Sequence, residues 1–201
     1  MIKLSALLFA VALVAGCAAY TLVAPQRQNV ADVISVEPGM KWNKMSQSAY
    51  EGHVEVWTLD GLTLNTLVFF TGVPDGEPLF VPRFADKARM EKPPVFRSTM
   101  NPLEIQELLH ATVARFFRTT LAEERNLRAV SIAGGRGFRF ETRVVGRDEV
   151  ERAGVFVGTV AGGKLYGAWF QGARLHYFER YLPEFERIVA SAQLTGEAAR
   201  K

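Results

Sequence analysis

The chain of 201 residues contains a single cysteine, Cys17, which lies just after an apolar N-terminal run. A lone cysteine cannot form a disulfide within its own chain, so the fold must be stabilised by the burial of apolar side chains. Without its first sixteen residues the chain keeps about 185, a length at which one domain buries roughly 70% of the surface of the unfolded chain. The sequence therefore favours one compact domain with a substantial core.

The N-terminal segment has the three regions of a secretory signal. Lys3 supplies a positive charge, residues 4–15 are mostly apolar, and small residues precede Cys17. A membrane-spanning helix needs about 20 apolar residues, and Gly16 ends this run earlier. We therefore expect residues 1–16 to be removed as a signal peptide.

The end of this segment, Val14-Ala15-Gly16-Cys17, resembles the lipobox of bacterial lipoproteins. The resemblance implies cleavage between Gly16 and Cys17, a diacylglyceryl thioether on the cysteine sulfur, and acylation of the new amine. Two or three acyl chains hold a protein stably on a membrane, whereas one binds reversibly. Position 18 is alanine instead of aspartate, which in Gram-negative lipoproteins favours the periplasmic face of the outer membrane. An ordinary signal peptide with an incidental cysteine is the alternative.

The remaining chain is predicted to contain a short tether and one domain. Residues 17–30 are interpreted as the lipidated cysteine and a tether of about a dozen residues, which spans at most about 40 Å when fully extended. Residues 31–201 are expected to form a single globular domain. The 24 Lys and Arg residues barely exceed the 21 Asp and Glu residues, so we expect no nucleic-acid partner.

Alternating apolar and polar residues predict two groups of strands. The first group covers residues 32–36, 52–59, 62–70 and 78–81, with turns at Asp60-Gly61 and Pro74-Asp75-Gly76. The second group is an antiparallel meander over residues 129–133, 137–145, 154–160 and 164–171, separated by glycine-containing turns.

Two helices are predicted, one between the strand groups and one after them. The first follows Asn101, which together with Pro102 and Glu104 forms a capping-box pattern at a helix start. The second covers residues 182–191, and residues 177–181 form either a separate turn or a kinked extension of it. This order predicts an α+β fold, in which an antiparallel meander packs against two amphipathic helices like a sandwich.

The closing segment has the pattern Leu-Pro-x-Phe-x-x-Ile-Val-x-Ser at residues 182–191. Following a long meander, this pattern resembles the end of the α/β/α sandwich of PsbP-like proteins. Those proteins are mainly binding or assembly factors. The resemblance therefore implies a partner-binding domain, and it carries over no functional residue.

Residues 158–164, Gly-Thr-Val-Ala-Gly-Gly-Lys, match the first seven positions of a phosphate-binding P-loop. The eighth position is Leu165 instead of the Ser or Thr that binds magnesium, and the following residues alternate as a strand where the motif requires a helix. We interpret the segment as a hairpin turn.

The chain carries no other recognisable catalytic motif. His53, His110 and His176 are not spaced as metal ligands, and no serine lies in a Gly-x-Ser-x-Gly elbow. We expect each histidine to be structural or exposed, and we predict no metal and no cofactor.

Two features are candidates for a binding surface. Trp57, Tyr166, Trp169 and Phe170 are typical of a core but could also line a groove, and Trp57 is the most doubtful because it shares a strand face with Glu55. The segment 82–98 is basic, and near a membrane it could contact anionic headgroups, although most such runs are solvated surface. The candidate residues are Trp57, Arg83, Lys87, Arg89, Lys92 and Arg97.

These patterns favour a lipid-anchored envelope protein whose non-catalytic domain binds or assembles with a protein or glycan of the envelope. One alternative is an envelope hydrolase with a Ser/His site assembled by the fold. Another is a carrier of a small apolar ligand, which an apolar cavity of several hundred cubic ångströms would support.

Overall fold

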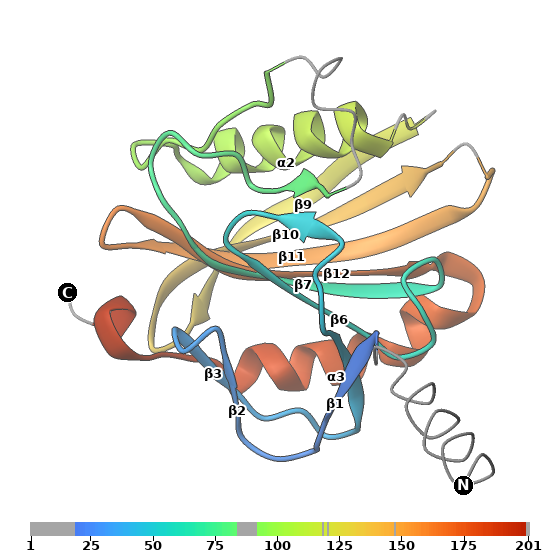
Figure 1. The fold of residues 1–201 in the computed structure, drawn as a ribbon. Helices are drawn as coiled ribbons and strands as arrows, with labels where there is room; N and C mark the ends of the chain where they lie inside the picture. The colour runs from blue at the N-terminus through green and yellow to red at the C-terminus, as the bar shows by residue number, and fades with distance from the viewer. Residues whose placement is uncertain (1–18, 84–91, 118, 120, 147, 200–201) are drawn as a thin grey trace, which may run out of the picture.

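The computed structural model describes residues 19–83, 92–117, 119, 121–146 and 148–199 (Figure 1). An eight-stranded antiparallel sheet runs through the molecule in the order β1-β4-β6-β7-β12-β11-β10-β9. Its strands are β1 (Tyr20–Val23), β4 (Trp42–Met45), β6 (Val54–Thr58), β7 (Asn65–Val73), β9 (Leu121–Ile132), β10 (Gly135–Val145), β11 (Glu151–Ala161) and β12 (Lys164–Ala173).

Two helices cover the sheet from opposite sides. Helix α2 (Pro102–Phe117) lies on one face and α3 (Glu179–Ala190) on the other (Figure 1). The shorter elements are β2 (Gln28–Val30), β3 (Ile34–Val36), β5 (Tyr50–Glu51), β8 (Val81–Pro82), β13 (Gln193–Leu194) and the helical turns η1 (Arg174–Phe178) and η2 (Gly196–Ala199). The predicted α+β fold is therefore confirmed, including the meander, whose four strands are longer than the sequence pattern indicated.

The central strands are apolar on both sides because each face of the sheet carries its own core. Every residue of β7 except Thr71 is buried, which is typical of a strand covered on both faces. On the α2 side, Phe140 and Phe156 stack with ring centroids 4.9 Å apart. On the α3 side, Phe170 stacks on Phe185 at 5.7 Å.

Helix α2 begins as its sequence predicts. The Asn101 Oδ1 accepts hydrogen bonds from the backbone N–H groups of Leu103 (2.9 Å) and Glu104 (3.1 Å). In return, Glu104 Oε2 accepts the Asn101 N–H at 2.7 Å. This is a complete capping box, which satisfies three backbone donors that the helix itself cannot bond.

Helix α3 starts earlier than predicted. The π-helical turn η1 runs directly into α3, so the segment before Leu182 is an extension of the helix and not a separate turn. Pro183 lies inside α3. The buried carboxylate of Glu184 ties the helix to the β3–β4 connection, because its Oε1 accepts the N–H of Gly39 at 2.7 Å and of Met40 at 3.3 Å.

The predicted tether over residues 17–30 is wrong for the described part of that range. β1 pairs with β4 from Tyr20↔Met45 to Val23↔Trp42, and β2 pairs with β3. The Pro25-containing stretch that suggested a linker is the turn between β1 and β2. A local pattern could not show this, because the partner strand β4 lies about twenty residues further along the chain.

The predicted two-residue turn at Asp60-Gly61 is also wrong. β6 ends at Thr58 and β7 begins at Asn65, so the connection is longer and the returning strand covers 65–73 instead of 62–70. Asn65 organises this loop, since its Oδ1 accepts the Leu59 N–H at 2.7 Å and its Nδ2 donates to Asp60 Oδ2 at 2.7 Å. Among the described residues, no helix combines the length and the hydrophobicity that a membrane-spanning helix needs.

Candidate functional site

Trp57 does not belong to a binding surface, which corrects the prediction. Its side chain is buried in the α3-side core, and its Nε1 donates to Glu55 Oε1 at 2.8 Å. Glu55 is also buried, and its other carboxylate oxygen accepts Lys44 Nζ at 2.7 Å. The shared strand face that made Trp57 doubtful is thus a core face on which a carboxylate binds the indole N–H.

The other candidate aromatic residues also lie in the core. Tyr166, Trp169 and Phe170 are buried, and Trp169 Nε1 donates to Thr142 Oγ1 at 3.2 Å. The interpretation of these rings as core is therefore confirmed.

The basic candidates are held by contacts within the domain. Arg83 Nε donates to the Ser48 carbonyl at 2.9 Å, and Arg97 Nη1 lies 3.1 Å from Asp75 Oδ2. The backbone N–H of Ser98, followed by the Arg97 side chain, lowers the pKa of the Asp75 carboxyl.

Lys92 is exposed, and its backbone carbonyl accepts Arg115 Nη1 at 2.7 Å. Lys87 and Arg89 fall outside the described residues. Of the four described candidates, Trp57 is buried and the Arg83 and Arg97 side chains are bonded within the domain, so Lys92 is left as an exposed candidate.

The three histidines lie apart, each beside a different partner. His53 Nε2 is 3.2 Å from Glu77 and His110 Nδ1 is 2.7 Å from Glu124, while the exposed His176 lies 3.4 Å from Arg180. Desolvation raises the pKa of Glu124, although the His110 hydrogen bond opposes this shift. Among the described residues, no His/Cys/Asp/Glu group of three or more could hold a metal ion. The convergence of His and Ser that a hydrolase would need is not found at these three positions.

The glycine-rich segment 158–164 is a hairpin, as interpreted. β11 continues to Ala161 and β12 begins at Lys164. Gly162 (φ +53°) and Gly163 (φ +73°) adopt the left-handed backbone conformation that such a turn requires. No helix follows the turn, so the arrangement that holds a phosphate in a P-loop is not formed here.

The apolar cavity between the sheet and α3 is small. It is lined by Val36, Phe69, Tyr166 and Ile188, among others, and has a volume of about 20 Å³. One water molecule needs roughly that much space. The several hundred cubic ångströms that would favour a carrier of apolar ligands are not found in this cavity.

A larger hollow, here called the end groove, opens at one end of the sheet and has a volume of about 430 Å³. The β6–β7 loop, the C-terminal half of α2, the β10–β11 connection and the end of β12 converge there. Its lining residues are Tyr50, Leu62, Thr63, Val113, Thr119, Val144, Gly146, Asp148, Arg152 and Gln171.

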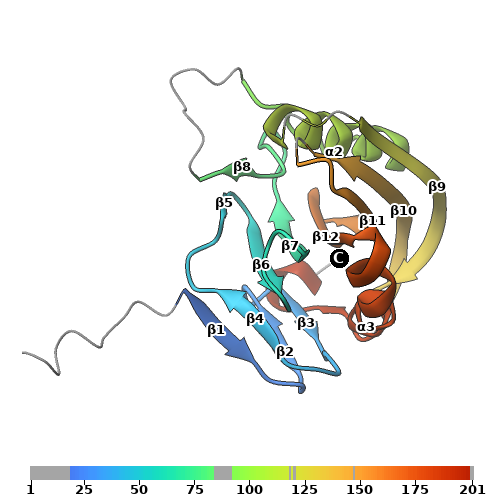
Figure 2. The ribbon, with the colours of Figure 1, turned by 90° about the vertical axis from the view of Figure 1, so that its right-hand side faces the viewer.

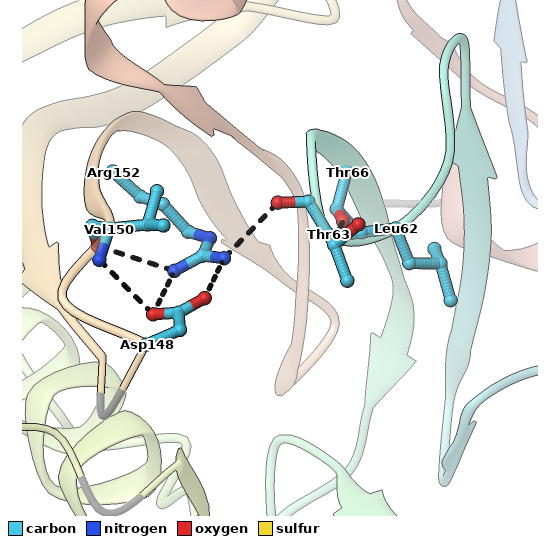
Figure 3. Close-up of polar contacts among 6 residues, drawn as sticks. All are labelled: Leu62, Thr63, Thr66, Asp148, Val150 and Arg152. Atoms are coloured by element: carbon cyan, nitrogen blue, oxygen red, sulfur yellow. Dashed lines mark hydrogen bonds and ion pairs between the residues drawn. The ribbon is translucent and has the colours of Figure 1, made fainter.

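An ion pair lies in the wall of the end groove (Figure 3). Arg152 forms a two-pronged contact with Asp148, from Nη2 to Oδ2 at 2.7 Å and from Nη1 to Oδ1 at 3.2 Å. The guanidinium also donates to the carbonyls of Val150 (3.3 Å) and Thr63 (3.2 Å). The Arg152 hydrogen bond lowers the pKa of Asp148 to about 2.

Arg152 joins the β10–β11 connection to the β6–β7 loop, because it binds Asp148 in the first and the Thr63 carbonyl in the second. Within that loop the Thr66 hydroxyl donates to the Leu62 carbonyl at 2.9 Å (Figure 3). Because Arg152 is neutralised by Asp148 and its donors are shared with two carbonyls, it is poorly suited to capture a free anion.

Tyr50 also lines the end groove. Burial raises the pKa of its phenol to about 12, so the group stays protonated in any physiological medium. Its ring packs against Phe80 with centroids 4.7 Å apart. Beside the Asp148–Arg152 pair, the lining includes the apolar side chains of Leu62, Val113 and Val144 and the uncharged polar side chain of Gln171. Such a lining suits a neutral amide or hydroxyl-bearing group, as in a peptide or a glycan.

Sequence reasoning did not find the end groove. The Asp148–Arg152 spacing of four residues was the only local signal, and it lay in a segment interpreted as a turn. The remaining groove residues come from positions as far apart as Tyr50 and Gln171, which only the strand order brings together.

The comparisons with known proteins place the fold but not the function. No protein-family model and no curated protein sequence matches the chain. The solved structure of cyanobacterial PsbP (CyanoP) from Synechocystis sp. PCC 6803 is similar to it, with 16% identity, a TM-score of 0.56, and coverage of 90% of this chain and 95% of that chain. The chain therefore has a PsbP-like fold, as its closing segment predicted.

A second structure is more distant. LpqN of Mycobacterium tuberculosis, described as involved in cell envelope biogenesis, matches at 9% identity and a TM-score of 0.36, over 91% of this chain and 88% of that chain. At this TM-score the similarity carries no argument about the present protein.

Proposed function

We propose that this protein is a lipid-anchored lipoprotein of the bacterial cell envelope, on the periplasmic face of the outer membrane, whose non-catalytic domain binds another envelope component. The observation that carries the proposal is the lipobox cysteine directly ahead of a folded domain. The sulfur of Cys17 would carry the lipid, and only Ala18 separates it from Ala19, whose carbonyl already accepts the Ser46 N–H at 3.0 Å.

Two further observations support a binding role. The acidic side chains beside His53 and His110 and in the end groove are engaged in ion pairs within the domain. These side chains are Glu77, Glu124 and Asp148. The end groove is large enough for a side chain or a sugar unit. The positive charge of Arg152 in its wall is neutralised by Asp148. The occupant that fits these features is a neutral segment of an envelope protein or glycan.

The experiment that tests this proposal is cross-linking in living cells. A photo-reactive residue is introduced at Thr63, an exposed residue on the rim of the end groove, and the matched control carries it at Glu107, an exposed residue of α2. After irradiation, membranes are isolated and adducts are identified by mass spectrometry. We expect a reproducible protein or glycan adduct from the Thr63 position only.

The same experiment is repeated with Cys17→Ser, which removes the sulfur that would carry the lipid. We expect this variant to leave the membrane fraction or to accumulate as unprocessed precursor, and to lose the adduct. Unchanged acylation and membrane association of Cys17→Ser would overturn the anchor. Equal labelling from Thr63 and Glu107 would overturn the end groove as the binding site.

A further inference from the structure

The two edge strands of the sheet protect their open edges differently. β1 and β9 lie at opposite ends of the strand order (Figure 2). The exposed residues of β9 include Glu123, Arg125 and Arg128, and its pairing with β10 is interrupted by a bulge near Asn126 (φ +57°). Charges and bulges are the usual means by which an edge strand avoids pairing with other chains.

β1 has neither device. Its sequence, Tyr-Thr-Leu-Val, contains no charged residue, and its side chains are exposed except for Val23. Tyr20 is 41% exposed and Leu22 is 62% exposed, two of the few large apolar side chains that the described chain leaves in solvent. An uncharged apolar edge is a liability unless something covers it.

Tyr20 and Leu22 share one face of β1. Side chains alternate along a strand, so Val23, which belongs to the α3-side core, points to the opposite face. The register agrees, because Tyr20 lies opposite Met45, which packs against the α2-side core. The exposed pair therefore lies on the α2 side of the sheet but at its β1 edge, away from the strands that α2 contacts.

The position of Cys17 indicates what covers this edge. Only Ala18 separates Cys17 from Ala19, so the Cα atoms of Cys17 and Ala19 lie within about 7 Å of each other. Ala19 is already joined to the domain through its hydrogen bond with Ser46. If acyl chains are attached at Cys17, a lipid surface comes within reach of β1, whatever the orientation of the rest of the domain.

We propose that the exposed face of β1, formed by Tyr20 and Leu22, is a contact surface for the phospholipid bilayer. This inference rests on the proposed lipid anchor at Cys17. Leu22 buries apolar surface among the upper acyl chains, and Tyr20 lies at the headgroup level, where an aromatic ring with one polar end is favoured. The domain is thereby held against the membrane by its β1 edge instead of moving freely on a tether.

Tryptophan fluorescence tests the contact directly. The three native tryptophans, Trp42, Trp57 and Trp169, are all buried in the described structure. A new tryptophan at an exposed position is therefore the one best placed to meet lipid. Leu22→Trp is the reporter and Tyr20→Trp a second one on the same face. Leu103→Trp, at a 52% exposed position on α2 across the molecule from β1, is the matched control (Figure 1).

The full-length acylated variants are reconstituted into phosphatidylethanolamine/phosphatidylglycerol vesicles, with or without bromine on the acyl chains. We expect brominated lipid to quench part of the emission of Leu22→Trp and Tyr20→Trp, beyond the loss seen for Leu103→Trp and for the unsubstituted protein. Sedimentation of each sample with the vesicles is measured in parallel.

The two proposals fail in different ways. Equal quenching of all variants, in protein that sediments with the vesicles, would overturn the contact surface and leave the anchor intact. Protein with an unmodified Cys17 that does not sediment would overturn the anchor, and the contact surface with it.

Discussion

At the scale of single residues, the ion pair between Asp148 and Arg152 is the main charged feature of the end groove. The carboxylate is exposed, whereas the guanidinium side chain keeps only 15% of its surface in solvent. The pair therefore stabilises mainly by giving a largely buried cation its partner, and solvent screening at the exposed carboxylate limits the Coulomb contribution.

We predict that Asp148→Asn lowers the free energy of unfolding at pH 7 by less than about 1 kcal/mol. The folded pKa of about 2 lies below the ordinary value of 3.8. The stabilisation is therefore present above about pH 4 and is lost as the pH falls through 2. Urea unfolding of both proteins from pH 7 to pH 2 measures this.

The difference between the two proteins should disappear at the acidic end of that range. Glu107→Gln on the exposed face of α2 serves as control and should unfold like the unsubstituted protein throughout. A difference for Asp148→Asn that persists undiminished at pH 2 would show that the carboxylate charge is not its origin.

At the scale of elements, α2 illustrates how a helix start can be determined by four consecutive residues. Asn101 and Glu104 exchange hydrogen bonds over distances of 2.7–3.1 Å, and Pro102 occupies the first helical position. The helix continues as an amphipathic element whose Ile105, Leu109 and Val113 enter the core.

We predict that Asn101→Ala destabilises the protein by about 1 kcal/mol, because two backbone donors lose their acceptor. Asn101→Asp, which keeps an acceptor oxygen at the same place, should retain most of the stability. Thermal or urea unfolding of the three proteins compares them. Equal stability of Asn101→Ala and the unsubstituted protein would mean that water satisfies the helix start equally well.

At the scale of the whole molecule, one sheet separates two cores that share its central strands. Phe140 lies in the core under α2 and Phe185 in the core under α3, and both side chains are fully buried. Because the strands belong to both cores, loss of either should unfold the entire domain in one transition.

We predict that Phe140→Leu and Phe185→Leu each cost about 1–3 kcal/mol of unfolding free energy. The double variant should cost the sum within about 0.5 kcal/mol, since the two rings lie on opposite faces of the sheet. Denaturant unfolding followed by both fluorescence and circular dichroism measures this. Two separate transitions, one sensitive to each substitution, would contradict a single domain.

The sequence by itself determined those features whose cause lies within a few residues. The capping box of α2, the Gly162-Gly163 hairpin and the alternation of the meander were predicted because neighbouring residues decide them. The PsbP-like fold was indicated by the closing helix pattern after that meander.

Only the tertiary structure decided features that depend on distant partners. Residues 20–23 form a strand because β4 pairs with them, and Trp57 is buried in a core where its ring packs against Trp42 and Phe69. The end groove joins residues from position 50 to position 171. Burial and strand pairing are properties of the folded chain. A short sequence such as that of β1 is therefore compatible with a tether or a strand until its partner strand is known.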